Sequence, residues 1–219
     1  MKKRKQVMYM LMDKNGMELL DAIDSISPTP GGGSISALVG ALGVCLVRMY
    51  GHLSVHKKKF SELDEKDQQV FIDAFETLSV YRNQLTDGIE RDCNAYDTFM
   101  EAYRLPKLTQ EEQKTRNQKL HTATLEAIDS PFSIMKASFE ALQLCEKMMK
   151  NGNRMAISDL ACGVIFLDAA LQSASFNVMI NLSSLSEEEK EKWENKITDL
   201  LTNSHKIKER IVNEVLKSL

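Results

Sequence analysis

The sequence has few of the residues that interrupt helices or cross-link small domains. It contains 10 glycines, 4 prolines and 4 cysteines among 219 residues. Few glycines and prolines mean few turns, and the long stretches rich in Leu, Ala, Glu, Lys and Met favour helix. A chain of this length buries enough surface to fold without cross-links. Since neither an internal repeat nor a low-complexity linker appears, we expect a single domain over residues 1–219.

The sequence also lacks the spacings typical of metal or disulfide sites. The cysteines are scattered through expected helices, without a Cys-x-x-Cys pair, as Cys45, Cys93, Cys145 and Cys162. His52 and His56 are four residues apart, but no carboxylate stands at a matching spacing. We therefore expect reduced, mostly buried cysteines, no metal site and a cytoplasmic location.

An excess of basic charge and a long hydrophobic run are both missing. The formal net charge is −3, which argues against a nucleic-acid partner. The basic residues 2–5 precede only six apolar residues, without the small-residue cleavage site of a signal peptide. The apolar run from Ile35 stops at Arg48, short of the roughly 20 residues of a membrane span. We expect a soluble protein with no membrane partner.

Hydrophobic periodicity, caps and prolines predict helices along the whole chain. The expected helices cover residues 15–26, 34–55, 64–104, from 109 onward, 131–150, 158–182 and from 186 onward. Thr109 and Ser186 each stand three residues before a glutamate, as in a capping box, and Pro131 is expected to begin a helix. The connections are short, which predicts an all-α, antiparallel helical bundle with long helices.

A proline- and glycine-rich turn leads into one of these helices. Residues 28–34 read Pro-Thr-Pro-Gly-Gly-Gly-Ser, and Ser34 is expected to cap the helix that follows. The unpaired N–H groups at such a helix start suit an anionic or carbonyl-bearing ligand. A purely structural turn is an equally good interpretation of these residues taken alone.

The helix predicted at 64–104 carries two charges on its apolar stripe. The stripe consists of Phe71, Phe75, Leu78, Leu85, Ile89, Tyr96, Phe99 and Tyr103. Arg82 and Asp92 fall on it, and a charge there must be paired, hydrated or neutralised. Asp92 is either part of a structural ion pair, for example with Arg82 across a two-fold interface, or a tunable acid–base group.

Six short motifs occur together in one order. They are the glycine turn at 28–34, Lys-Lys-Lys-Phe at 57–60, Asp-Cys-Asn-Ala-Tyr at 92–96, Arg-Leu-Pro-Lys at 104–107, Gly152-Asn153 with Ser158-Asp159, and Asn-Val-Met-Ile-Asn-Leu at 177–182. The combination resembles the cyclodeaminase/cyclohydrolase family of folate enzymes over about residues 15–185. That resemblance implies a helical subunit that dimerises through helix packing, a site beside the subunit interface and a tetrahydrofolate substrate.

The resemblance also implies roles for individual residues. Asp92 matches the family's catalytic aspartate, and the glycine loop (Gly31, Gly32, Gly33 and Ser34) is expected to face the ligand. Because lysines suit carboxylates, Lys57 and Lys107 are candidates for the glutamate or polyglutamate tail, although a solvated basic helix end explains Lys57 equally well. Candidates for the pterin edge are Asn153, Asp159 and Asn177; cross-helix hydrogen bonds and a helix cap are the structural alternatives. The chemistry requires no metal and no cofactor beyond the folate.

Three functions fit this interpretation. The first is methenyltetrahydrofolate cyclohydrolase, favoured because the chain carries no formiminotransferase half. The second is formiminotetrahydrofolate cyclodeaminase, and the third is a folate-binding helical dimer without turnover. Glu90, where relatives often have aspartate, and His56, before the lysines, depart from the family pattern.

Overall fold

The computed structural model describes residues 11–219, and every regular element in this part of the chain is a helix. The α-helices are α1 (Gly16–Ile23), α2 (Gly32–Val55), α3 (Lys58–Ser61), α4 (Glu65–Tyr103), α5 (Gln110–Met148), α6 (Ile157–Asn181) and α7 (Glu187–Ser218). Short 3₁₀ turns lie at η1 (Leu11–Asp13), η2 (Arg154–Ala156) and η3 (Leu182–Ser184). The predicted all-α class is confirmed. The basic run at residues 2–5 lies outside the described residues.

Side-chain caps begin the long helices where the sequence predicts them. Thr109 and Ser186 each accept the backbone N–H of the glutamate three residues later, and that glutamate binds the cap residue's own N–H in return. Both predicted capping boxes are therefore present at the starts of α5 and α7. A third box, unpredicted, begins α1 at Asn15.

The predicted helix start at Pro131 is wrong, because α5 continues from Gln110 to Met148 with this proline inside it. Proline has no N–H, so the carbonyl of Ala127, four residues earlier, lacks its helical donor. Asn181 at the end of α6 supplies one: its Nδ2 donates to Ala127 O at 3.0 Å and to Asn177 O at 2.8 Å. A side chain from the neighbouring helix thus replaces the missing hydrogen bond.

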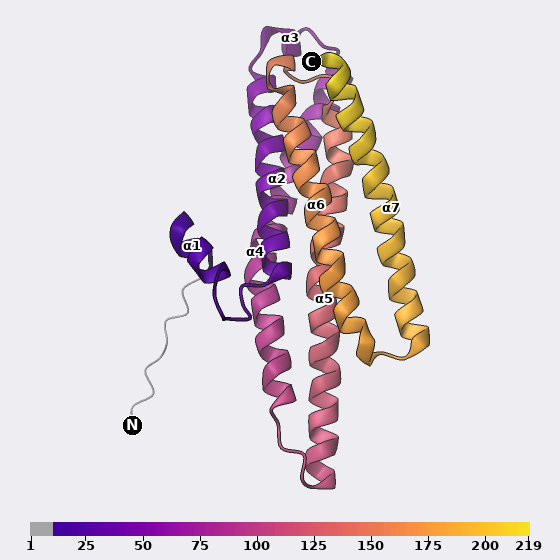
Figure 1. Ribbon diagram of the computed structural model, residues 1–219. Helices are drawn as coiled ribbons and strands as arrows, with labels where there is room; N and C mark the ends of the chain where they lie inside the picture. Colours follow the sequence, from indigo (N-terminus) through magenta and orange to yellow (C-terminus); the bar gives the residue numbers. More distant parts are fainter. Residues whose placement is uncertain (1–10) are drawn as a thin grey trace.

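Four long helices form the bundle, and α7 covers one side of it (Figure 1). Helix α2 packs against α6 and α4, α5 packs against α4 and α6, and α7 lies on α6 and α5. The α4–α5 hairpin extends well past the ends of the other helices, while α1 stands beside the start of α2. The predicted antiparallel bundle with long helices is confirmed.

Glycines bring α2 and α6 into close contact. A Cβ added at Gly163 would lie 2.6 Å from Val47 Cγ2 and 2.7 Å from Gly43 O, closer than real side chains approach. Backbone therefore packs directly on backbone where the two helices cross. This contact prevents α2 from sliding along its axis relative to α6, and therefore fixes the position of the N-terminus of α2.

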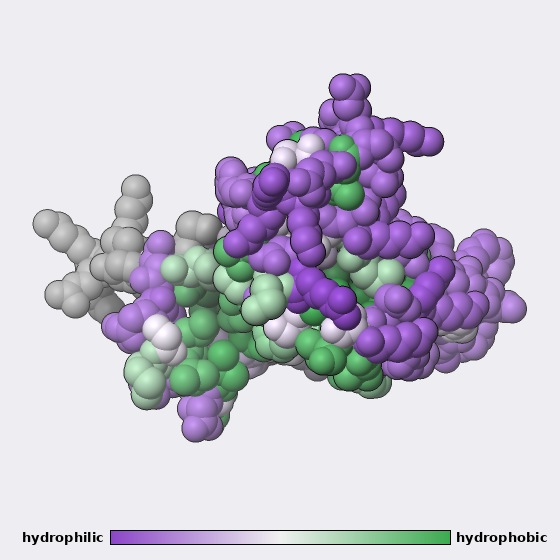
Figure 2. Space-filling model, turned by 90° about the horizontal axis from the view of Figure 1, so that it is seen from above, coloured by the Kyte–Doolittle hydropathy of each residue, from purple (hydrophilic) through white to green (hydrophobic). Residues whose placement is uncertain are grey.

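One face of the bundle, formed by α2 and α6, exposes apolar side chains. The exposed apolar residues of this α2/α6 face are Leu42, Met49, Leu53, Ile165, Phe166, Phe176, Met179 and Ile180. Seen from above, hydrophobic residues gather along the lower edge of the molecule, and hydrophilic residues cover most of the remaining surface in view (Figure 2). A contiguous patch of this kind is typical of an interaction surface.

The same two helices are long and apolar. By length and composition alone, Gly32–Val55 and Arg154–Ser184 could each cross a membrane, a test that core helices of soluble proteins also pass. Half of each segment's most apolar window is buried inside the bundle. Arg48, where the apolar run ends, donates to Phe75 O and stacks 4.5 Å from the centre of that ring. Both segments therefore already serve as core helices of this bundle.

Candidate active site

The site begins at the first turn of α2, where the glycine loop ends. Gly31 is the N-cap residue and provides no side-chain cap. The prediction that Ser34 caps this helix is wrong, because Ser34 lies inside the first turn and its hydroxyl points to α4. A helix start without its own cap leaves N–H groups that another element must satisfy.

Asp92 on α4 supplies the partner that the first turn of α2 lacks. Its Oδ2 accepts a hydrogen bond from Ser34 Oγ at 3.1 Å, and the backbone N–H of Ser34 donates to the same carboxylate. The carboxylate therefore caps α2 from a different helix, at the positive end of its dipole. Residues 58 positions apart in sequence form this contact.

Gly33 makes room for the carboxylate. A Cβ on Gly33 would lie 2.3 Å from Asp92 Oδ1 and 2.4 Å from Oδ2, well inside contact distance. Only glycine at this position allows the carboxylate to approach the helix backbone so closely. The third of the three glycines thus has a steric function.

Burial raises the pKa of Asp92, and the hydrogen bonds from the Ser34 side chain and backbone only partly oppose this effect. A raised pKa brings a carboxyl group closer to neutrality and suits it to proton transfer. Within the described part of the chain Arg82 does not pair with Asp92, since Arg82 is exposed and donates to Asn83 Oδ1 at 3.1 Å. An ion pair across a two-fold interface stays the structural alternative. Arg82 lies off the buried stripe because the stripe passes through Tyr81 instead.

Asn177 approaches the glycine loop from α6. A Cβ on Gly32 would lie 3.1 Å from Asn177 Nδ2 and 3.2 Å from Oδ1, so the amide covers this part of the loop. Its Nδ2 donates to Ser173 O at 3.0 Å within α6. The loop, Asp92 and Asn177 therefore converge from α2, α4 and α6.

A cavity of about 320 Å³ opens beside this cluster, between α4 and the segment that precedes α2. Its lining residues include Lys14, Thr29, Pro30, Glu90, Cys93 and Asp97. Cys93 Sγ is 3.1 Å from Ser34 Oγ, which links the cavity to Asp92. Sequence reasoning missed this role of Cys93, although its position directly after Asp92 was a signal that could have revealed it.

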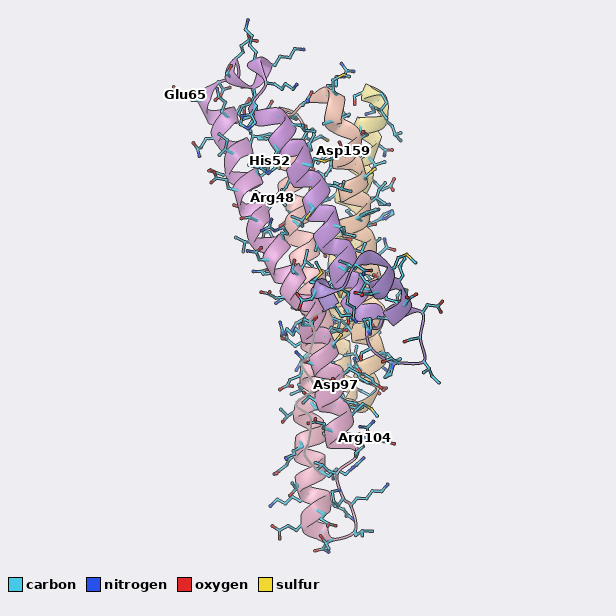
Figure 3. All side chains as sticks on the ribbon, turned by 90° about the vertical axis from the view of Figure 1, so that its left-hand side faces the viewer. Arg48, His52, Glu65, Asp97, Arg104 and Asp159 are labelled. Atoms are coloured by element: carbon cyan, nitrogen blue, oxygen red, sulfur yellow. The ribbon has the colours of Figure 1, made fainter. Side chains whose placement is uncertain are left out.

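The remaining predicted site residues lie far from Asp92 in the same chain. Lys57 follows the C-terminal end of α2, and Asn153 is anchored there through Nδ2 to Leu53 O at 3.1 Å. Helix α2 has 24 residues, which corresponds to about 36 Å. Figure 3 shows Asp159 near this end and Asp97, which follows Asp92 on α4, far along the molecule from it.

Lys107 lies apart from both groups, in the loop between α4 and α5 at the tip of the hairpin.

The backbone N–H and side chain of Asn153 make structural hydrogen bonds, including a cap on η2. Among residues 11–219, no group of three or more His, Cys, Asp or Glu side chains is placed to hold a metal ion.

Comparison with known proteins gives consistent matches over most of the chain. A family model described as formiminotransferase-cyclodeaminase matches residues 16–213. The methenyltetrahydrofolate cyclohydrolase of Methylorubrum extorquens is 38% identical over 168 residues, which are 77% of this chain and 79% of that protein. The formimidoyltransferase-cyclodeaminase of Mus musculus is 30% identical over 192 residues, 87% of this chain but 35% of the mouse protein. The chain thus spans about a third of that longer relative.

The fold has a close counterpart among solved structures. The crystal structure of formiminotetrahydrofolate cyclodeaminase from Thermotoga maritima superposes with a TM-score of 0.75 and covers 96% of this chain and 98% of its own. Sequence identity between the two is 24%, so this likeness establishes the shared helical fold.

Proposed function

The chain belongs to the formiminotransferase-cyclodeaminase family, and from this premise we propose that it is a methenyltetrahydrofolate cyclohydrolase in which Asp92 is the acid–base group. The observation that supports this role most directly is the half-buried Asp92 carboxylate at the glycine-rich start of α2. The 38% identical protein of Methylorubrum extorquens is named methenyltetrahydrofolate cyclohydrolase, which supports the choice of this reaction.

The reaction needs one group that takes up a proton and later returns it. Water adds to the cationic carbon that bridges nitrogen-5 and nitrogen-10, and the carboxylate accepts a proton from that water. The bond from the carbon to nitrogen-5 then breaks, and the carboxyl group returns its proton to this leaving nitrogen. The remaining hydroxyl of the adduct becomes the formyl carbonyl and releases its proton to solvent, which gives the 10-formyl product. A single carboxyl group with a raised pKa serves both steps, and such catalysis contributes about 10²–10⁴-fold. Neither a metal nor a redox cofactor is required.

The second candidate is formiminotetrahydrofolate cyclodeaminase, in which nitrogen-10 attacks the formimino carbon and ammonia leaves. The cyclodeaminase relatives favour it. Both reactions pass through a tetrahedral carbon between the two nitrogens. In the cyclodeaminase the same carboxyl group would accept the proton of the attacking nitrogen-10 and donate a proton to the amine that leaves as ammonia, and one further proton comes from solvent.

Two assays on one protein separate the candidates. A cyclohydrolase bleaches the near-ultraviolet band of methenyltetrahydrofolate faster than the spontaneous reaction, whereas a cyclodeaminase produces that band from formiminotetrahydrofolate and releases ammonia. Folate binding with neither change would indicate the non-catalytic dimer.

The working unit in this proposal is a homodimer that buries the α2/α6 face. Phe176 and Ile180 are 68% and 73% exposed on this face, and Phe166 is 39% exposed. Between Gly31 and Val47 α2 carries no acidic or basic side chain, so a second copy of the same apolar surface is a suitable partner.

An antiparallel arrangement of the two copies explains the separated site residues. A two-fold axis across the middle of α2 places the C-terminal end of the partner's helix beside the N-terminal end of the first. The lysine at position 57 and the aspartate at position 159 of one subunit then approach Asp92 of the other. The glutamate tail and pterin edge of the substrate would contact these residues across the interface.

Subunit exchange tests this arrangement. Asp92→Asn and Asp159→Asn variants, each inactive alone, are mixed and allowed to exchange. If each site uses both residues from different subunits, half of the randomly exchanged dimers contain one intact site, and activity recovers to about one quarter of the wild-type value. No recovery would place both residues in sites of a single chain.

A further inference from the structure

The hydroxyl of Ser34 lies between two side chains of α4. Its Oγ is 3.1 Å from Asp92 Oδ2 and 3.1 Å from Cys93 Sγ. A serine hydroxyl has one proton to donate, and an ionised carboxylate can only accept. The hydroxyl proton therefore goes to Asp92, and the Cys93 thiol must donate to Ser34 Oγ.

The surroundings keep Cys93 in the thiol form that this direction requires. Burial raises the pKa of Cys93, and the hydrogen bond with Ser34 only partly opposes this effect; the negative charges of Asp92, Glu90 and Asp97 act in the same direction as burial. Cys93 lines the 320 Å³ cavity together with Glu90, Asp97 and Lys14.

Among the described residues, Asp92 is the one charged group to which the Ser34 hydroxyl is hydrogen-bonded, although Lys14, Glu90 and Asp97 line the adjoining cavity. The first three turns of α2 carry no ionisable side chain, and α6 presents the neutral Asn177. On the α5 side, Asp129 is paired with Arg91. The hydrogen-bonded chain thus has one direction, from Cys93 through Ser34 to Asp92.

We propose that Ser34 is the positioning residue of Asp92 and that Cys93 holds the Ser34 hydroxyl in the orientation this requires. The proposal rests on the acid–base role given to Asp92 above. Ser34 is fully buried, and its N–H and O–H both bind the carboxylate, so it has no donor left for a substrate. This distinguishes it from the ligand-facing role that the family resemblance implies.

Loss of the hydroxyl has a defined consequence. A hydrogen bond to the ionised form favours ionisation, so Ser34→Ala raises the pKa of Asp92 further. The carboxylate must be ionised to accept a proton, and the acidic limb of the kcat/KM profile therefore moves to higher pH. We expect kcat to fall about tenfold, since one of two contacts that orient the carboxylate is lost, while KM stays near its wild-type value.

A graded set of variants tests the hydrogen-bonded chain from Cys93 through Ser34 to Asp92. Ser34→Cys, with a weaker donor of similar size, should lie between wild type and Ser34→Ala. Cys93→Ser keeps a donor and should retain the wild-type pH profile, whereas Cys93→Ala should shift it in the same direction as Ser34→Ala but less. Ser36→Ala is the matched control: its buried hydroxyl binds Gly32 O and Ser173 Oγ instead of Asp92.

Carboxyl-carbon NMR gives a readout that does not depend on turnover. The Asp92 resonance is identified by its loss in Asp92→Asn, and its titration is followed in each variant. A higher pKa of Asp92 in Ser34→Ala, with no change of this pKa in Ser36→Ala, supports the proposal even if neither folate is turned over. An unchanged titration overturns it, as does an effect of Ser34→Ala confined to KM, which would make Ser34 a substrate ligand. Thermal unfolding of both variants controls for misfolding.

Discussion

At the scale of single residues, the site combines a buried carboxylate with a backbone that admits it. Burial raises the pKa of Asp92 above its unfolded value, so the folded state holds the proton to higher pH than the unfolded state does. Between the two pKa values the stability of wild type therefore falls as pH rises.

The Asp92→Asn variant should lack this pH dependence. The amide keeps an oxygen that can accept from Ser34 but pays no desolvation cost for a charge, so its melting temperature at pH 7 should equal or exceed that of wild type. Melting curves from pH 3 to pH 8 measure both effects. A clearly lower melting temperature at pH 7 would mean that the ionised carboxylate stabilises the fold.

Gly33→Ala should lower the activity by displacing the Asp92 carboxylate from its place beside the helix backbone. The new methyl group occupies the place of Asp92 Oδ1, so the carboxylate must move by an ångström or more, at a cost of about 100-fold in kcat. Gly16→Ala is the control, because a Cβ there meets nothing within 4 Å. Steady-state kinetics of both variants measures the difference, and equal activity would remove the steric role of Gly33.

At the scale of helices, α5 depends on a contact that its own sequence does not show. Asn181→Ala leaves the Ala127 carbonyl without a donor from α6, which should cost about 1 kcal/mol of unfolding free energy. In a Pro131→Ala background the restored N–H satisfies that carbonyl within the helix, so the same substitution should cost much less. Urea unfolding of the four proteins in this double-mutant cycle gives the coupling, and additive effects would contradict the model.

The ends of the helices show what local sequence can predict and what it cannot. The starts of α5 and α7 were predictable because a capping box involves residues three apart. The start of α2 was not, because its cap is Asp92 in another helix. The apparent break at Pro131 follows correctly from local rules, and only the position of Asn181 in the folded chain overrides it. Likewise, Arg82 could be placed on or off the buried stripe only once the path of α4 was known.

At the scale of the whole molecule, the α2/α6 face should determine the assembly. Phe166→Glu and Ile180→Glu place a charge on this face and should convert the proposed dimer to monomers, with loss of activity if the site needs both subunits. Leu108→Glu is the control, since Leu108 is 90% exposed in the α4–α5 loop, away from the face. Light scattering after size exclusion measures the mass of each variant. A wild-type monomer with full activity would contradict this expectation.

The position of the candidate site was only partly predictable from the sequence. The apolar stripe and the family motif both selected Asp92, and the structure brings it to Ser34 and the glycine loop. Sequence order gives no distances, however, so the same motif set included Lys57, Asn153 and Asp159 at the other end of α2. The shared fold and the family membership explain why those motifs occur together, and the proposed dimer explains how they meet.

The most direct test follows the near-ultraviolet absorbance of methenyltetrahydrofolate with wild type, with Asp92→Asn and without enzyme. The carboxylate mechanism predicts that the band decays faster with wild type, and that the variant loses at least about 100-fold of this acceleration. The Asp92→Asn substitution should also leave the folded state intact, as the melting curves would show. Near-normal decay with a folded Asp92→Asn protein would contradict the assignment of Asp92 as the acid–base group.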